Sequence, residues 1–243
     1  MDARLAEGRA NEIRDRLRAM ADPAGEAGVQ RFFKDGVKSL GIRTPALRKL
    51  SQEFVKAHRG TVGLDEALAL GERLIRCELL EEKAMALLLA ERFAGRLRPA
   101  HVAVFDRWID YADNWATIDG ICSTSLGKII LRNGPPMDDL LAWAGDASLW
   151  RRRAAAVSLV PSARRGKYLD ESLRVADRLM ADEEDLVQKG VGWLLKEQSA
   201  QHSDEVVDYL KRWAGTTSRL VLRYATEKLP AERRREVLEY RPE

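Results

Sequence analysis

Apolar residues recur at spacings of three and four along almost the whole chain, and strictly alternating apolar and polar stretches are missing. Because an α-helix completes a turn in about 3.6 residues, this spacing gathers apolar side chains on one helix face. A half-buried strand would instead alternate residue by residue. The pattern therefore predicts helices throughout the chain.

Glycine and proline interrupt this pattern at intervals that leave helix-length segments joined by short turns. The predicted breaks lie at residues 23–28, 41–45, 60–63, 98–99, 133–136, 145–146, 161–166, 215–217 and 229–230. Short connections favour neighbouring antiparallel helices, so we expect helix pairs.

A short register recurs within the predicted helices: a large apolar residue, two variable residues, a basic residue and usually a small one. It occurs at residues 80–84, 150–154, 186–190 and 220–224. The basic residues Arg153 and Lys189 are 36 positions apart, and Lys189 and Arg223 are 34 apart. Lys83 and Arg153 are 70 positions apart, which is close to two such periods.

One copy of the register is therefore expected after Lys83. Counting 35 positions on reaches Ile118, where Trp115 keeps the large apolar position but the basic residue is replaced and Asp119 follows. A period of this length with two helices per unit is typical of an α-solenoid, in which equivalent positions project from one face. The pattern predicts a ladder of basic side chains with Asp119 isolated among them. A chance match in a helical sequence rich in Arg and Leu is the competing interpretation.

Length and composition narrow the class of protein. The 243 residues, 45% of them hydrophobic, are enough for one extended domain, which we expect to span residues 1–243. The net charge of +3 excludes both a histone-like basic tail and a halophile-like acidic coat. The charged N-terminus and the short apolar run at 84–90 predict a cytoplasmic protein without a membrane partner. The scattered cysteines and histidines predict neither disulfides nor a metal site.

Basic residues on a concave helical surface suit the phosphate backbone of a nucleic acid, where each neutralised phosphate releases counterions. A further cluster near the middle of the chain strengthens this interpretation. It comprises Arg151, Arg152, Arg153, Arg164, Arg165 and Lys167. A charge run is otherwise a solvated helix face, and that alternative stays open for Arg152.

Three residues stand out as candidates for chemistry. Trp115 is four residues before Asp119, which places both on one helix face, and Trp193 is four residues beyond Lys189. An acid in an apolar helical stretch needs a cap, a partner or a function. An ion pair with a nearby Arg is the alternative for Asp119, and core packing is the alternative for both tryptophans. Core positions are assigned to Trp108, Trp143 and Trp213.

Four segments together carry a resemblance to a known family. They are residues 40–45 (LGIRTP) with Arg48, 114–119 (NWATID), 150–155 (WRRRAA) and 187–197 (VQKGVGWLLKE). On these segments the chain resembles the AlkD family of DNA alkylation repair glycosylases, which are HEAT-like helical solenoids. The resemblance implies that Asp119 is the catalytic carboxylate, that Trp115 and Trp193 contact the substrate, and that Arg153 grips the DNA backbone.

The fold expected from pattern and resemblance together is all-α: a right-handed α-solenoid of HEAT-like helix pairs with a concave basic face. The expected function is that of a DNA N-glycosylase in base excision repair. It would excise cationic N3- or N7-alkylated purines (3-methyladenine, 7-methylguanine) from duplex DNA without base flipping, as a monomer without cofactor or metal. DNA contacts are expected from Lys83, Arg153, Lys189, Lys196 and Arg223.

The chain departs from the family pattern at two places, and other functions remain open. Asn114 stands where a second aromatic residue often precedes the central Trp, and the amide expected near residues 32–35 is absent. A glycosylase for bulky alkyl adducts is one alternative. Another is a non-catalytic HEAT-repeat protein that recognises DNA shape, and a third is a protein-binding scaffold with an apolar groove.

Overall fold

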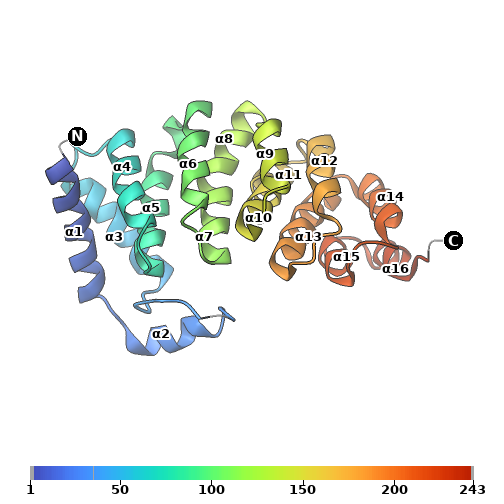
Figure 1. Cartoon of the computed structure of the whole chain (residues 1–243), viewed down its shortest axis with the longest axis horizontal. Coiled ribbons are helices and arrows are strands. Elements are labelled where there is room, and N and C mark those ends of the chain that lie inside the picture. Colours follow the sequence, from blue (N-terminus) through green and yellow to red (C-terminus); the bar gives the residue numbers. More distant parts are fainter. Residues whose placement is uncertain (1–2, 35, 242–243) are drawn as a thin grey trace. The chain divides into compact units, whose positions relative to one another are not determined.

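The computed structural model describes residues 3–34 and 36–241, and within them all regular structure is helical (Figure 1). This confirms the predicted all-α class. No helix in these ranges is both long enough and apolar enough to cross a bilayer. The internal contacts divide the chain into two compact units, unit 1 (Met1–Ser125) and unit 2 (Leu126–Glu243), which are described separately below. A single domain over residues 1–243 stays a prediction.

Unit 1 is built from two rows of helices. In one row α1 packs on α4 and α4 on α6, while in the other α3 packs on α5 and α5 on α7. The pair α4 and α5 joins the rows. The elements are α1 (Ala3–Ala19), α2 (Pro23–Gln30), α3 (Thr44–Ala57), α4 (Leu64–Ile75), α5 (Leu80–Arg92), η1 (Ala94–Arg96), η2 (Pro99–His101), α6 (Val102–Ile109), α7 (Trp115–Gly120) and the π-helical stretch η3 (Ile121–Leu126).

Unit 2 repeats the plan. The helices α10, α13 and α15 pack on one another in sequence, and α9 and α12 lie beside α10 and α13. Helix pairs that bury their apolar faces against the next pair confirm the solenoid-like prediction. The elements are α8 (Gly127–Asn133), α9 (Met137–Ala144), α10 (Leu149–Val157), α11 (Val160–Ala163), α12 (Leu169–Leu179), α13 (Asp185–Ser199), α14 (Ser203–Trp213), α15 (Arg219–Ala225) and α16 (Ala231–Glu239).

The recurring basic residue has a common place in these helices. Lys83 is the fourth residue of α5, and Arg153, Lys189 and Arg223 are each the fifth residue of α10, α13 and α15. Their exposure differs, because Lys83 and Arg153 are only 3% and 6% exposed while Arg223 is exposed. The register therefore marks the first turns of one helix row in each unit. The right-handedness of the solenoid and its concave basic face stay predictions.

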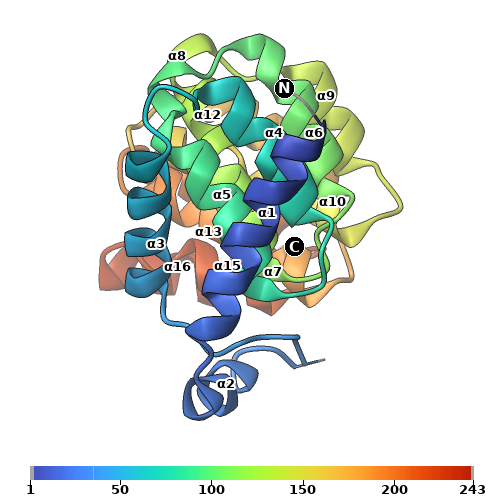
Figure 2. The same ribbon diagram turned by 90° about the vertical axis from the view of Figure 1, so that its left-hand side faces the viewer.

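The predicted break at residues 23–28 is wrong, because these residues belong to helix α2. The side chain of Asp22 caps the helix by accepting from the backbone of Ala24 at 3.1 Å, and Pro23 occupies the first turn, where its missing N–H costs nothing. Conversely, the described residues between α2 and α3 form no helix. Figures 1 and 2 both show α2 projecting past the ends of α1 and α3.

The segment before α3 is held to α5 by one buried carboxylate. Glu81 accepts from the Ser39 hydroxyl at 2.7 Å and from the backbone N–H groups of Leu40 at 2.9 Å and Ile42 at 3.2 Å. A carboxylate that is 2% exposed is tolerated only with such donors. Glu81 therefore fixes the path of the LGIRTP segment along the start of α5.

Gly71 allows a close contact between α4 and α6. A Cβ at Gly71 would lie 2.3 Å from the rigid indole of Trp108, which is fully buried and donates to Glu72 at 2.8 Å. We expect Gly71→Ala to lower the free energy of unfolding, since overpacking costs about 1–3 kcal/mol and the better helix propensity of Ala returns only about 1 kcal/mol. Urea denaturation measures the change.

Gly8→Ala in α1 is the matched control, because no atom other than those of its neighbours and of the adjoining turns of α1 lies within 4 Å of its added Cβ. There the helix propensity acts alone, so we expect this variant to be more stable than the wild type. Equal stabilisation by both substitutions would contradict the close contact at Trp108.

Candidate functional site

The candidate residues of unit 1 lie on the short helix α7, which carries Trp115 at its first position and Asp119 at its fifth. The helix begins at Trp115 because the side chain of Asn114 caps it, accepting from the backbone N–H of Thr117 at 2.9 Å. Trp115 and Asp119 are both half-buried. Their spacing of four residues places them on one face of α7, as the sequence predicted.

A chain of polar contacts leads from Lys83 to this cap. The Lys83 ammonium contacts the carboxylate of Asp113 at 2.6 Å and donates to the backbone carbonyl of Tyr111 at 2.9 Å. The other carboxylate oxygen of Asp113 accepts from the Asn114 amide at 2.7 Å. The side-chain oxygen of Asn114 in turn accepts the hydrogen bond from the backbone N–H of Thr117 that caps α7. Lys83 thus braces the start of the helix that carries Asp119.

Directly after Asp119, α7 approaches α5 at Gly120, and the chain then continues as a wider π-helical turn. A Cβ at Gly120 would lie 2.3 Å from a terminal methyl of Leu87, so a larger residue there would require the Leu87 side chain to move. The π-helical stretch η3 follows at once, with the hydroxyl of Ser123 donating to the Asp119 carbonyl and that of Thr124 to the Gly120 carbonyl. Such π-helical turns occur frequently at functional sites.

The ring of Trp115 is held by the segment after α2. Phe33 stacks on it with centroids 5.3 Å apart and an interplanar angle of 16°, and the indole N–H donates to the carbonyl of Phe32 at 3.3 Å. Gln30 closes this segment by exchanging two hydrogen bonds with the backbone of Val37, at 2.6 and 3.1 Å. Asp35, the last of the residues where an amide was expected, lies outside the described residues.

An open, largely apolar pocket of about 350 Å³ lies beside Trp115 in unit 1. Its walls include the aromatic residues Phe32 and Phe33 from the segment after α2 and the aliphatic residues Leu80, Ala84 and Leu87 from α5. Phe32 is 72% exposed at its edge, which is unusual for so large an apolar side chain. Trp115 is therefore accessible from an apolar hollow.

The candidate residue of unit 2 is Trp193, which lies on α13. The indole N–H of Trp193 donates to the carboxylate of Glu197 at 3.0 Å. Glu197 also contacts Lys228 at 2.5 Å and Arg164 at 3.5 Å. The guanidinium of Arg164 lies over the Trp193 ring, 5.4 Å from its centroid. A buried carboxylate thus anchors one tryptophan and two cations.

Burial by itself raises the pKa of Glu197, but the hydrogen bonds from Lys228 and Trp193 and the charge of Arg164 outweigh it and hold the pKa below its usual value. A lowered pKa in the folded state means that ionised Glu197 stabilises the fold above its usual pKa. That contribution is lost as the pH falls through the lowered value.

We therefore expect Glu197→Gln to lower the free energy of unfolding at neutral pH by about 1.5–3 kcal/mol, the contribution of a hydrogen bond to a charged group. The difference from the wild type should shrink as the solution is acidified below the pKa of Glu197. Glu227→Gln is the control, because Glu227 makes a more exposed ion pair with Lys196 at 2.8 Å. Urea titrations that show no difference between the two variants would contradict the anchoring role.

The remaining predicted DNA contacts of unit 2 have different surroundings. Arg153 is buried and donates to the backbone carbonyl of Leu186. Lys189 is half-buried and lies 3.9 Å from Asp185. Lys196 pairs with Glu227 and lies 5.7 Å from the centre of the Tyr224 ring, while Arg223 is exposed. In this structure Lys189 and Arg223 are the better placed to reach a phosphate.

Several residues of the site were missed by sequence reasoning. Phe33, Asp113 and Glu197 contact candidate residues but were not singled out from the sequence. Arg164 was assigned only to a basic cluster, and its contact with Trp193 was not predicted. Glu197 had a usable signal, because it lies four positions after Trp193 on the same predicted helix. Asn114, which departs from the family pattern, caps α7 in the structure. The described residues contain no cluster of His, Cys, Asp and Glu able to hold a metal ion.

Comparisons with known proteins agree with this picture of the fold. A family model described as "DNA alkylation repair enzyme" matches residues 13–229. Among solved structures, a predicted DNA alkylation repair enzyme from Enterococcus faecalis superposes with a TM-score of 0.76 at 20% sequence identity. The match covers 87% of this chain and 98% of the other. No protein with a curated function matches the sequence.

Proposed function

Because this chain belongs to the DNA alkylation repair enzyme family, we propose that it is a DNA N-glycosylase acting on cationic N3- and N7-alkylated purines. The observation that carries the proposal is the half-buried carboxylate of Asp119, four residues from Trp115 on one capped helix. This placement offers a negative charge beside an aromatic ring that is open to an apolar hollow.

The chemistry needs little more than a placed carboxylate. An N3- or N7-alkylated purine already carries positive charge, so the electron pair of the breaking C1′–N bond neutralises the departing base without a general acid. The sugar becomes oxocarbenium-like, and a water oxygen then bonds to C1′ and loses a proton. The Asp119 carboxylate stabilises the positive sugar and accepts or directs that proton, as one carboxylate does in glycoside hydrolysis.

Aromatic rings would select the lesion by its charge. A cation over the face of a Trp ring is stabilised by about 0.5–2 kcal/mol of cation–π attraction, which a neutral purine lacks. Trp193 already holds the Arg164 guanidinium over its ring, which supports its capacity to hold a cation. Trp115 has one face against Phe33, and its N–H bond to Phe32 fixes the ring plane. Under this proposal both tryptophans contact the damaged nucleotide without a base-flipping pocket.

The DNA backbone would be gripped by the basic residues of the recurring register and by Lys196. Arg223 and Lys189 are accessible for this role. Lys83 is the exception within the register: a phosphate contact would require its ammonium to leave Asp113 and the Tyr111 carbonyl, so we propose that it braces α7 instead.

Release of free base from a duplex with one 7-methylguanine, without added metal or nucleotide, tests the proposal. We expect free 7-methylguanine and an intact strand with an abasic site, and no release from duplexes that carry unmodified guanine or neutral uracil. Retention of the duplex without any release would instead support a non-catalytic protein that recognises DNA shape.

Excision of bulky alkyl adducts is a second candidate, favoured by the apolar pocket of about 350 Å³ beside Trp115. Ala84→Phe places a ring in this pocket and should slow release of a purine with a bulky apolar N3 substituent. Release of 7-methylguanine should change little. Equal rates of wild type and variant on the bulky substrate would exclude a role for the pocket.

A further inference from the structure

A basic pocket of unit 1 lies at the end of α3, the end of α5 and the loop that enters α4, and it shares no lining residue with the pocket beside Trp115. Its volume is about 520 Å³. Four cationic side chains line it: Lys56, Arg59, Arg92 and Arg96. No carboxylate is among the lining residues, and all four cations are exposed. The recurring basic register includes none of them.

The charge of this pocket is uncompensated. Among the described residues, none of the four cations forms a side-chain ion pair or hydrogen bond. Three acids near them in sequence are bound elsewhere: Glu53 pairs with Arg16, Glu66 with Arg9 and Glu91 with Arg48. Asp65, in the first turn of α4, is exposed and is not among the lining residues. Four like charges around one hollow repel one another, and an anion bound among them relieves that repulsion.

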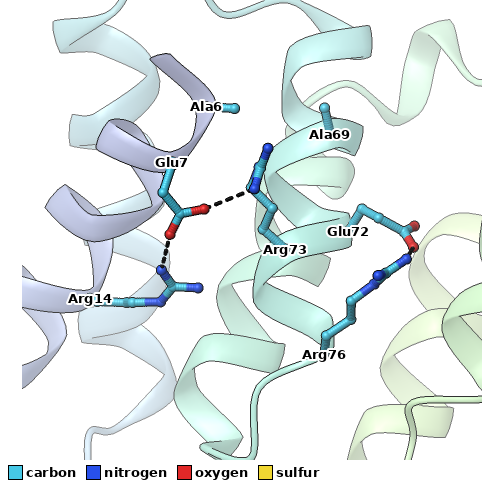
Figure 3. Close-up of a pocket in the computed structure, with 7 residues that line it drawn as sticks. All are labelled: Ala6, Glu7, Arg14, Ala69, Glu72, Arg73 and Arg76. Carbon is cyan, nitrogen blue, oxygen red and sulfur yellow. Dashed lines mark hydrogen bonds and ion pairs between the residues drawn. The ribbon is translucent and has the colours of Figure 1, made fainter. Parts of the chain in front are cut away.

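Another pocket of unit 1 shows the contrast (Figure 3). There Glu7 bridges Arg14 at 2.9 Å and Arg73 at 2.8 Å, and Glu72 pairs with Arg76 at 2.6 Å. Those arginines already have carboxylate partners from α1 and α4, so their pocket has little demand for an anion. The pocket of Lys56, Arg59, Arg92 and Arg96 has no such internal partners.

The backbone adds to the positive potential. Gly63, the cap residue of α4, lines the pocket, so the positive end of the dipole of this helix faces it. Gly60, at φ 89°, takes the left-handed conformation that turns the loop toward this helix. Arginine guanidinium groups match the oxygens of a phosphate in paired hydrogen bonds.

We propose that this pocket binds a phosphate group, through Arg59, Arg92 and the neighbouring cations Lys56 and Arg96. The phosphate belongs either to the backbone of bound DNA or to a free phosphate compound. The proposal goes beyond base excision and does not depend on Asp119.

The test compares Arg59→Gln/Arg92→Gln with a matched control, Arg174→Gln/Arg178→Gln, which removes two exposed cations from α12. Binding of an undamaged duplex is measured as a function of salt, and binding of inorganic phosphate and pyrophosphate by calorimetry. Circular dichroism and thermal unfolding establish that each variant is folded, and 7-methylguanine release is followed separately.

If the phosphate is that of DNA, the pocket variant loses at least tenfold in duplex affinity. Its slope of log affinity against log salt then falls by about 0.9 for each lost phosphate contact, while the control keeps both. If the phosphate is free, duplex binding is unchanged but the variant loses the saturable phosphate or pyrophosphate binding of the wild type. Unchanged duplex binding with no phosphate binding by the wild type overturns the proposal. Because undamaged DNA is used, failure of the glycosylase reaction leaves this result unaffected.

Discussion

Replacing Asp119 by Asn is expected to slow base release from a 7-methylguanine duplex by about 10²–10³-fold, the range seen when one electrostatic stabiliser of a transition state is removed. The amide keeps the size of the side chain but not the charge that stabilises the oxocarbenium-like sugar. Single-turnover release with enzyme in excess measures this effect on the chemical step alone. Duplex affinity should stay the same or rise, because a negative charge is removed near the phosphates.

The control for this substitution is Asp208→Asn, which changes an exposed Asp in the middle of α14. We expect wild-type rates from it. Thermal unfolding of both variants separates loss of chemistry from loss of fold. Base release at the wild-type rate by Asp119→Asn would refute the catalytic role of Asp119, whatever its effect on binding.

Lys83→Met should lower the rate of base release by roughly 10–100-fold, because small displacements of a catalytic group carry costs of this size. The substitution removes the brace on Asp113 and hence on the Asn114 cap of α7. Stability should fall by only about 1–3 kcal/mol, since the Asp113 side chain is 58% exposed and water replaces its lost partner. The salt dependence of duplex binding should not change.

Arg223→Gln should show the opposite of Lys83→Met, with a change in the salt dependence of duplex binding and none in the rate of base release. This exposed residue occupies the same register as Lys83, so its loss should lower the salt slope by about 0.9 and leave the rate on bound DNA unchanged. Asp113→Asn should reproduce Lys83→Met, and the double variant should be little worse than either, because both act through one contact. If Lys83→Met instead lowers the salt slope and spares the rate, Lys83 is a phosphate contact, as the sequence register suggested.

Much of the molecule could be predicted from local pattern. The spacing of apolar residues is a property of each helix alone, so it determined the helical class and several of the helix boundaries. The repeated register also located the first turns of α5, α10, α13 and α15, because each repeat presents the same face to its neighbour. The spacing of Trp115 and Asp119 placed them on one helix face for the same local reason.

Local sequence pattern did not predict features that depend on contacts with other parts of the fold. Pro23 looked like a break but begins a helix, because proline is as suitable at a first turn as at an end. Lys83 and Arg223 share a register, yet Lys83 is buried because Asp113 and the Tyr111 carbonyl face it. Burial of a charged side chain requires partners, which can be distant in sequence. The spacing of residues along the chain does not indicate them.

The sequence by itself determined that this protein is a helical, solenoid-like chain and that Trp115, Asp119 and Trp193 lie on helices. Those features follow from spacing along a single helix and from repetition between helices. Only the tertiary structure decided which cations are accessible, that Phe33 holds Trp115, and that Glu197 anchors Trp193. The four uncompensated cations around the α3–α4 loop also come together only in the fold, because Lys56 and Arg59 lie far from Arg92 and Arg96 along the chain.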